Sequence, residues 1–496
     1  MYSKKKSPNI KVNFIFTVLF QVFSVLSSFI TAPYVSRVLT VEGIGTYSYI
    51  SAIQFYFILI SALGTATYGA REISRIRDEK KSVSIKFWEI ELLTIVTSGI
   101  SIVAWVIFSS CFTDYSRYCF LLLPALIASM FDISWLFNGL ERMPLIVTRN
   151  LIARIIGIIC TFVFVKSTQD LPIYFIIQSG TTLLANLSMW LDLPKVLDRI
   201  DFKEINVWQH LKPTIMYFIP TVSSSIYLVL DKVLLGVFTQ GVSENGYYTQ
   251  AESVISICKN IVFMALNSVV GVRISYLYKN NQYDEIKKRV EYSFNYLSFM
   301  GLGCVFGIWA VAKLFIPLFY GPGYEKSVIV LILFAPILLF TSVSSCLNAQ
   351  YFVPVGRRVE CTRYIIAGAL VNLILNVVLI PKFQSCGAVV ASVIAEAIIG
   401  YLFWKNSDGI INIKTIFNVS WKKVCSGMIM LLSITGFNSL VKSNSIIVLV
   451  TDIGLGVVVY VLSLLFLFKD KWTNNITLST FVMIKEKLAN ICRSSG

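Results

Sequence analysis

Residues 445–468 read SIIVLVTDIGLGVVVYVLSLLFLF, an apolar run that contains a single charged residue, Asp452. As a helix, a stretch of about 20 mostly apolar residues is long enough to cross the roughly 30 Å of hydrocarbon in a bilayer. Similar runs occupy residues 44–68 and 365–380. Because a membrane-spanning backbone must satisfy its own hydrogen bonds, these runs predict transmembrane helices.

The composition extends this prediction to the whole chain. Of its 496 residues, 56% are hydrophobic and 14% are charged, whereas a soluble domain carries about 25% charged residues. The first apolar run is long and has no small-residue cleavage site, so we expect it to remain in the mature protein. The sequence therefore predicts an all-α, polytopic membrane protein.

About fourteen apolar stretches are predicted to span the membrane. They cover residues 12–36, 44–69, 87–109, 118–139, 144–165, 172–192, 212–236, 246–271, 292–316, 326–349, 361–381, 386–404, 423–441 and 446–468. We group them into an N-lobe (1–192), a cytoplasmic linker (193–211), a C-lobe (212–404), a final helix pair (405–468) and a cytoplasmic tail (469–496).

The basic residues predict which side of the membrane is cytoplasmic. The net charge is +16, but Lys and Arg lie mostly between the apolar runs, which favours the positive-inside rule over nucleic-acid binding as their explanation. About 33 of them fall at the termini and in loops after even-numbered helices, against about 7 in the other loops. Both termini are therefore predicted to be cytoplasmic.

The cysteine and histidine pattern does not predict a metal site. The 10 cysteines are scattered without a CxxC spacing, and His210 is the one histidine of the chain. Zinc sites need closely spaced Cys or His ligands. We therefore expect neither a metal nor a cofactor.

The two halves of the chain repeat short motifs at an offset of about 200 residues, an arrangement typical of transporters built from parallel repeats. The matched pairs are SRVL at 36–39 with DKVL at 231–234, GTYS at 45–48 with GYYT at 246–249, and Asn138 before Pro144 with Asn348 before Pro354. Helices 1–6 and 7–12 are therefore predicted to form two pseudo-symmetric lobes.

The sequence TAPYVSRVL at 31–39, followed by EGIGTYSY at 42–49, resembles the opening of the bacterial polysaccharide flippases, the Wzx or O-antigen transporter family. DK at 231–232 and GYY at 246–248 are similar to the second half of that family. The resemblance extends through about Lys469. It implies the wider superfamily that includes multidrug exporters and the lipid II flippase.

The resemblance also implies a cargo, a location and partners. The cargo is an oligosaccharide repeat unit of O-antigen, capsule or another polymer, carried on undecaprenyl pyrophosphate. It would move from the cytoplasmic to the outer leaflet of the bacterial inner membrane by alternating access, with H⁺ or Na⁺ as the coupling ion. Expected partners are membrane lipids, a polysaccharide polymerase and a chain-length regulator, and no nucleic acid.

Ionisable side chains inside predicted helices are costly and therefore candidate functional residues. Arg154 and Lys259 lie mid-helix, and Arg37 and Lys232 lie near outer helix ends, so we predict that these four bind the anionic head group. The candidates for a coupling ion are Asp132, Asp231, Glu252 and Glu396. Two alternatives stay open, namely that Arg37 snorkels to the interface and that Glu252 neutralises Lys259.

Two other functions compete with a flippase. A multidrug exporter of the same superfamily favours cationic drugs and needs buried carboxylates, but residues 12–36 contain none. A membrane-bound polysaccharide polymerase or ligase generally uses a large outer loop, whereas each predicted outer loop has about a dozen residues or fewer. The sequence therefore favours a transporter with an anionic cargo and no enzyme activity.

Overall fold

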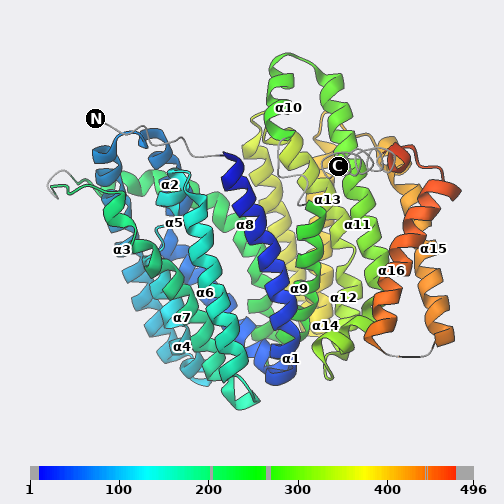
Figure 1. Cartoon of the computed structure of the whole chain (residues 1–496), viewed down its shortest axis with the longest axis horizontal. Helices are drawn as coiled ribbons and strands as arrows, with labels where there is room; N and C mark the ends of the chain where they lie inside the picture. Colours follow the sequence, from blue (N-terminus) through cyan, green and yellow to red (C-terminus); the bar gives the residue numbers. More distant parts are fainter. Residues whose placement is uncertain (1–9, 202–204, 264–269, 442, 444, 476–496) are drawn as a thin grey trace, which may run out of the picture. The chain divides into compact units, whose positions relative to one another are not determined.

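The computed structural model describes residues 10–201, 205–263, 270–441, 443 and 445–475. Within these ranges the regular elements are all helices (Figure 1), so the predicted all-α fold is confirmed. Parts of both predicted cytoplasmic ends, residues 1–9 and 476–496, lie outside the described residues, as do residues 264–269 of the predicted eighth span.

The helices follow the predicted apolar stretches closely. The first half contains α1 (Ile10–Ala62), α2 (Thr65–Ile76), α3 (Lys80–Cys111), η1 (Thr113–Tyr115), α4 (Ser116–Met130), α5 (Ser134–Gly139), α6 (Met143–Phe164), η2 (Thr168–Asp170), α7 (Leu171–Trp190), η3 (Leu193–Lys195), η5 (Trp208–His210), α8 (Leu211–Phe238) and α9 (Ser243–Phe263). The second half contains α10 (Val270–Lys279), α11 (Tyr283–Tyr320), α12 (Glu325–Phe334), α13 (Ile337–Leu347), η7 (Asn348–Phe352), α14 (Arg358–Lys405), α15 (Ile413–Val441), α16 (Ile446–Leu462) and η8 (Ser463–Leu467).

Two pairs of predicted spans are joined by kinks in place of loops. Helix α1 covers the first span and most of the second, and it is interrupted at Thr40, whose φ of 61° and ψ of 178° are not helical. Helix α14 covers the eleventh and twelfth spans and is interrupted at Gln384, with φ 55° and ψ −131°. A positive φ is costly for a residue with a Cβ, so surrounding packing must hold both kinks in place.

The described residues contain nine helical segments that are long and apolar enough to cross a membrane by length and composition. Two of these segments, Ile15–Ile76 and Arg358–Lys405, each overlap two of the predicted spans. A multi-pass membrane protein is therefore established, and the number of about fourteen crossings stays a prediction.

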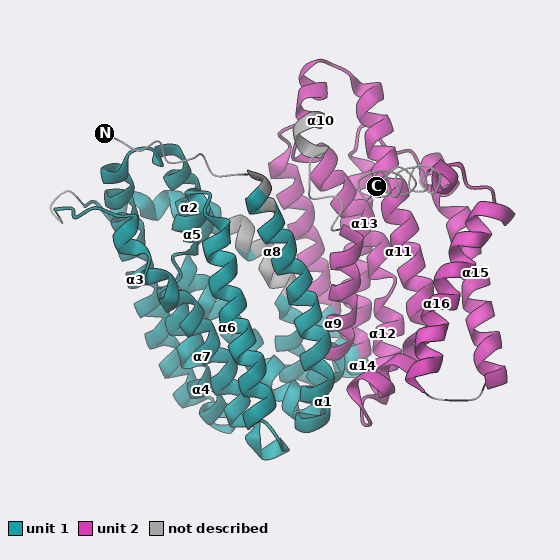
Figure 2. Cartoon of the chain, in the orientation of Figure 1, with its two compact units in different colours: residues 1–249, 376–385 teal, residues 250–375, 386–496 magenta. Residues whose placement is uncertain are grey.

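The chain divides into two compact units, coloured separately in Figure 2. Unit 1 contains residues 1–249 and 376–385, and unit 2 contains residues 250–375 and 386–496. Helix α8 belongs to unit 1 because it packs against α1 and α2. The division thus falls inside α9 and α14 and not at the linker 193–211, and the predicted lobe boundaries stay a prediction.

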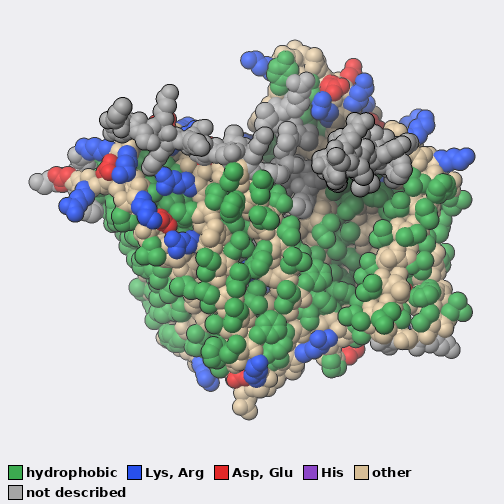
Figure 3. All heavy atoms as spheres, viewed as in Figure 1, with side chains coloured by type: hydrophobic (Ala, Val, Ile, Leu, Met, Phe, Trp, Pro, Cys, Tyr) green, Lys and Arg blue, Asp and Glu red, His purple; other side chains and the backbone are tan. Residues whose placement is uncertain are grey.

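Helix α3 shows how the helices are oriented toward lipid. Its apolar residues Ile100, Val103 and Ile107 are at least 60% exposed, and the opposite face buries Ser98 and Ser101. In Figure 3, hydrophobic side chains cover the middle of the visible face of each unit, and charged side chains gather at the helix ends. An apolar outside with polar groups inside is the arrangement expected of helices surrounded by hydrocarbon.

Candidate functional site

Unit 1 contains a cavity of about 450 Å³. It lies among the helices α1, α6 and α7. Its walls are formed by Phe20, Ser27, Thr31, Val35, Asn150, Ala153, Arg154, Gly157, Ile158, Thr161, Tyr174, Gln178, Thr181, Thr182, Ala185 and Asn186. Amides, hydroxyls and one guanidinium therefore face a space within the hydrophobic part of the helices.

Arg154 supplies the positive charge of this cavity. It lies near the middle of α6, roughly 15 Å from either end of that helix. Its guanidinium donates hydrogen bonds to the hydroxyl of Ser24 at 2.8 Å, to the carbonyl of Ser24 at 3.3 Å and to the hydroxyl of Ser28 at 3.4 Å. These partners on α1 are uncharged, and the described part of the chain gives Arg154 no ion pair with a carboxylate.

The cavity walls favour a polar, anionic ligand. No Asp or Glu belongs to the residues that line the cavity in the described structure. Asn150, Gln178 and Thr182 come from α6 and α7 and offer donors and acceptors of the kind that sugar hydroxyls need. A guanidinium is suited to phosphate because its donors form a planar fork.

Lys259 of unit 2 has a different environment. It lies on α9, is half-buried, and is attracted electrostatically by Glu396 of α14 and by Glu252 of its own helix. Glu396 is 5% exposed and also accepts a hydrogen bond from the hydroxyl of Ser344 at 3.4 Å. The positive charge of Lys259 therefore has two acidic neighbours. The alternative that Glu252 neutralises Lys259 stays open, and Glu396 is a second carboxylate that could do so.

The other predicted site residues lie outside the cavity walls. Arg37 is exposed and Lys232 is half-buried. Asp231 is 1% exposed and accepts hydrogen bonds from the Tyr248 hydroxyl at 2.7 Å and from the Asn376 amide at 2.6 Å.

Asp132 is half-buried in the turn between α4 and α5, where it accepts a hydrogen bond from the backbone N–H of Ser134 at 3.0 Å. The roles predicted for Arg37, Lys232, Asp231 and Asp132 stay predictions.

Sequence reasoning missed the neutral residues of the site. Asn150, Gln178 and Asn186 carry no charge, and amide side chains within apolar runs give no signal that separates cavity walls from helix contacts. It also passed over Glu89 and Glu91, although both fall inside the predicted span 87–109. Their position inside an apolar stretch was the signal that could have identified them.

Residues 10–271 match the family model described as "Polysaccharide biosynthesis protein". This chain belongs to the polysaccharide biosynthesis protein family. This family member is 24% identical over 396 residues to the "Putative O-antigen transporter" of Escherichia coli (strain K12), a match that covers 79% of this chain and 95% of that relative. It is 26% identical over 251 residues to the "Probable low-salt glycan biosynthesis flippase Agl15" of Haloferax volcanii, covering 49% and 51% of the two chains.

The fold of this polysaccharide biosynthesis protein is similar to that of a solved structure, "Lipid II flippase MurJ, inward closed conformation". The TM-score is 0.70 at 18% sequence identity, and the match covers 92% of this chain and 99% of the other. The family model and the curated relatives confirm the resemblance found in the sequence. The relatives are named as transporters and flippases, which confirms the prediction of a transporter and not an enzyme.

Proposed function

We propose that this protein is a flippase that moves undecaprenyl-pyrophosphate-linked oligosaccharide repeat units from the cytoplasmic to the outer leaflet. In this proposal the cargo head group enters a hydrated polar cavity while its polyprenyl tail stays in lipid. Transport is by alternating access and is coupled to an ion. The names of the relatives support the glycan cargo, and the fold supports the mode of transport.

The observation that carries the proposal is Arg154 in the polar cavity of unit 1. A cation at this depth of a membrane helix is costly unless a ligand, water or counter-charge stabilises it. The hydrogen-bond partners of Arg154 are serine oxygens, which leave its positive charge in place. A phosphate group of the cargo would neutralise that charge through charge-assisted hydrogen bonds, and neighbouring amides would contact the sugar.

The competing function, export of cationic drugs, fits this cavity less well. A cationic ligand would be repelled by Arg154, and the lining residues include no carboxylate to attract it. A wall with one guanidinium and several amides and hydroxyls favours an anion that carries many hydroxyl groups.

The proposal is tested with purified protein reconstituted in liposomes that contain fluorescent undecaprenyl-pyrophosphate oligosaccharide. The leaflet that holds the label is scored with a membrane-impermeant quencher, with and without an imposed proton or sodium gradient. We expect protein-dependent movement of the label between leaflets. Equal movement in protein-free liposomes, or transport of a cationic dye in its place, would overturn the proposal.

Arg154 itself is tested in cells. Arg154→Ala is expected to abolish surface polysaccharide at unchanged membrane abundance, and Arg154→Lys is expected to retain part of it because the charge persists without the fork. Arg117→Ala removes an exposed cation at the start of α4 and serves as the matched control. Wild-type polysaccharide levels in Arg154→Ala would exclude Arg154 from cargo binding.

A further inference from the structure

Helix α3 contains a buried carboxylic acid that neither the fold nor the cavity explains. The side chain of Glu91 is fully buried, and neither of its carboxylate oxygens forms a hydrogen bond in the described part of the chain. A carboxylate buried without a cation or a hydrogen-bond donor is costly, and such groups within membrane helices mark proton or ion pathways.

Glu89, two residues earlier on the same helix, is a buried carboxylate with a structural role, because its oxygens have several hydrogen-bond partners. Its oxygens accept hydrogen bonds from Lys86 at 2.8 Å, from the backbone N–H of Asn206 at 3.0 Å and from Gln209 at 2.7 Å, and one lies 2.9 Å from the ring of His210. Glu89 thus ties the segment before α8 to α3. Glu91 makes no such contact, so the same explanation does not apply to it.

The buried hydroxyl groups near Glu91 are explained by helix packing. Glu91 belongs to a polar stripe along α3 that continues through Thr94, Ser98 and Ser101. Ser98 bonds the hydroxyl of Ser61 at 2.6 Å, and Ser101 donates to a backbone carbonyl of α1 at 2.7 Å. Small hydroxyl residues commonly join membrane helices in this way. The stripe alone is therefore no site, and Glu91 is its unsatisfied member.

Two groups from other elements neighbour the Glu91 carboxyl. The carboxylate of Asp132 repels it electrostatically, and the indole of Trp135 lies close to it. Trp135, on α5, is 2% exposed, and its indole nitrogen also lacks a hydrogen-bond partner in the described residues. Asp132 lies in the turn before α5 and is half-buried, so it is more accessible than the fully buried Glu91. Two neighbouring carboxylates repel one another, and a proton bound to one of them removes that repulsion.

Three other titratable groups in this part of unit 1 have partners of their own. The hydroxyl of Tyr68 on α2 lies 2.7 Å from Nδ1 of His210 on η5, and Nε2 of His210 contacts Glu89. Asp192, which follows α7, is paired with Arg149 at 3.0 Å and with Lys195 at 2.7 Å. Asp132 is thus the charged group that acts on Glu91.

We propose that Glu91 and Asp132 form a proton-binding site in unit 1, in which the Glu91 carboxylate accepts a proton that arrives from water through Asp132. Protonation converts the carboxylate into a neutral acid, no electrons move, and deprotonation returns the proton to water later in the cycle. The geometry favours a proton over Na⁺. A sodium ion needs several oxygen ligands, whereas the indole of Trp135 can only donate.

The role of this proton in driving transport rests on the proposed flippase function, whereas proton binding does not. Proton binding is measured by infrared difference spectroscopy on purified protein in lipid nanodiscs, between alkaline and acidic buffer and without cargo. We expect a carbonyl band of a buried protonated carboxylic acid that Glu91→Gln abolishes and Glu91→Asp retains at a shifted position. Glu141→Gln, which removes an exposed carboxylate paired with Arg77, is the control that should keep the band.

Identical difference spectra for wild type and Glu91→Gln, in protein that stays monodisperse, would overturn the proton site. The liposome assay then separates this proposal from the flippase function. Cargo movement that a proton gradient accelerates in wild type should lose that acceleration in Glu91→Gln. Acceleration that persists in Glu91→Gln would show that proton coupling does not use Glu91, whereas a titrating Glu91 in protein that moves no cargo would refute the flippase function alone.

Discussion

Gly45 of α1 lies against the backbone just before α9, and Gly246 of α9 lies against the backbone of α1. A methyl group added to Gly45 would overlap the carbonyl oxygen of Val242, and one added to Gly246 would overlap the carbonyl oxygen of Val41. One turn further along each helix, the hydroxyls of Ser48 and Thr249 lie 2.5 Å apart. These are the glycines that open the GTYS and GYYT motifs, so the matched motifs of the two halves meet each other in unit 1.

This contact predicts the effect of a methyl group at either glycine. Replacing glycine by alanine within a helix normally stabilises it by about 0.5–1 kcal/mol, but overpacking costs about 1–3 kcal/mol. The destabilisation from overpacking should be the larger effect at Gly246, because the nearest obstructing atom is the backbone carbonyl oxygen of Val41, which cannot rotate away. We expect Gly246→Ala to lower the unfolding temperature of the protein in detergent.

Gly99→Ala is the matched control for this measurement. Gly99 is a helical glycine of α3 with no atom within 4 Å of the added methyl group. This variant should unfold at the wild-type temperature or slightly above it. Equal unfolding temperatures for Gly246→Ala and Gly99→Ala would show that the crossing at Gly45 and Gly246 tolerates a side chain.

The sequence was sufficient to predict the helices but not the way they join. Apolar runs such as 446–468 are long because a helix needs about 20 residues to cross the hydrocarbon core of a bilayer. The length of such a run therefore predicts a helix, as it does for α16. The kinks at Thr40 and Gln384 were not predictable, because each depends on packing that holds a non-glycine residue at positive φ. A hydropathy pattern does not distinguish a kinked helix from two helices joined by a short loop.

The candidate site was predictable in its charges and not in its neutral walls. Arg154 was identified because a cation in mid-helix is rare, and the cavity of unit 1 includes it. Asn150 and Gln178 were not identified, because uncharged polar residues are common at contacts between membrane helices. Glu396 could not be singled out as a neighbour of Lys259, because the two residues lie more than a hundred positions apart in the chain.

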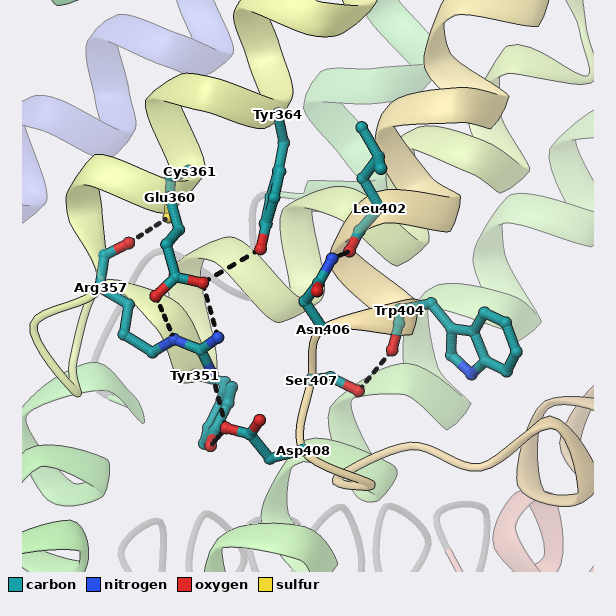
Figure 4. A network of polar contacts seen from close by, with 10 residues as sticks. All are labelled: Tyr351, Arg357, Glu360, Cys361, Tyr364, Leu402, Trp404, Asn406, Ser407 and Asp408. Carbon is teal, nitrogen blue, oxygen red and sulfur yellow. Dashed lines mark hydrogen bonds and ion pairs between the residues drawn. The ribbon is translucent and has the colours of Figure 1, made fainter.

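Arg357 anchors a polar network at the start of α14 in unit 2 (Figure 4). Its guanidinium donates to both oxygens of Glu360, at 2.7 and 2.6 Å, and to Asp408 at 2.6 Å, which also accepts a hydrogen bond from Tyr351 at 2.8 Å. Hydrogen bonding to Glu360 is the main cause that raises the pKa of Arg357, which therefore stays charged at every accessible pH. The network holds together the segment before α14 and the loop after it.

We predict that Arg357→Lys destabilises the protein, because an ammonium group cannot bind two carboxylates through a planar fork. The expected loss is about 1 kcal/mol, in the range of partly exposed ion pairs. It is measured as a lower unfolding temperature in detergent. Arg358→Lys, at the neighbouring exposed position, is the control and should leave that temperature unchanged. Similar values for the two variants would mean that the fork geometry contributes nothing.

Asp170 predicts a dependence of stability on pH. It closes the turn before α7 by accepting hydrogen bonds from the backbone N–H groups of Lys166 and Ser167 and from the hydroxyl of Ser167. These donors lower the pKa of Asp170 below its ordinary value. A lowered pKa in the folded state stabilises the protein above the ordinary aspartate pKa of about 3.9, and this stabilisation is lost as the pH falls through the folded-state pKa.

Asp170→Asn should therefore lower the unfolding temperature at neutral pH, and the difference from wild type should disappear in strongly acidic buffer. The measurement is thermal unfolding across a pH series in one detergent. Asp114→Asn, at an exposed carboxylate in η1, controls for the loss of one negative charge. A deficit of Asp170→Asn that stayed constant down to the lowest pH would assign the effect to the shape of the side chain and not to its charge.

Lys259 has two possible roles that can be measured separately, namely a structural role beside Glu396 and a role in binding the cargo. Lys259→Ala would remove a cation that attracts the buried Glu396, and a buried carboxylate that loses a neighbouring cation destabilises the folded protein. We therefore expect less protein in the membrane for Lys259→Ala, and near-normal amounts for the double variant Lys259→Ala/Glu396→Gln, in which the uncompensated charge is gone. Membrane abundance is read by immunoblot.

The amount of surface polysaccharide then tests the role of Lys259 in cargo binding. If Lys259 contacts the anionic head group of the cargo, as we predict, the double variant is abundant in the membrane but makes little surface polysaccharide, and Lys259→Arg retains more than Lys259→Ala because the charge persists. Lys313→Ala, at an exposed position of α11, should behave as wild type in both measurements. Wild-type polysaccharide in the double variant would identify Lys259 as a structural counter-charge of Glu396 and would leave Arg154 as the cationic residue for cargo binding.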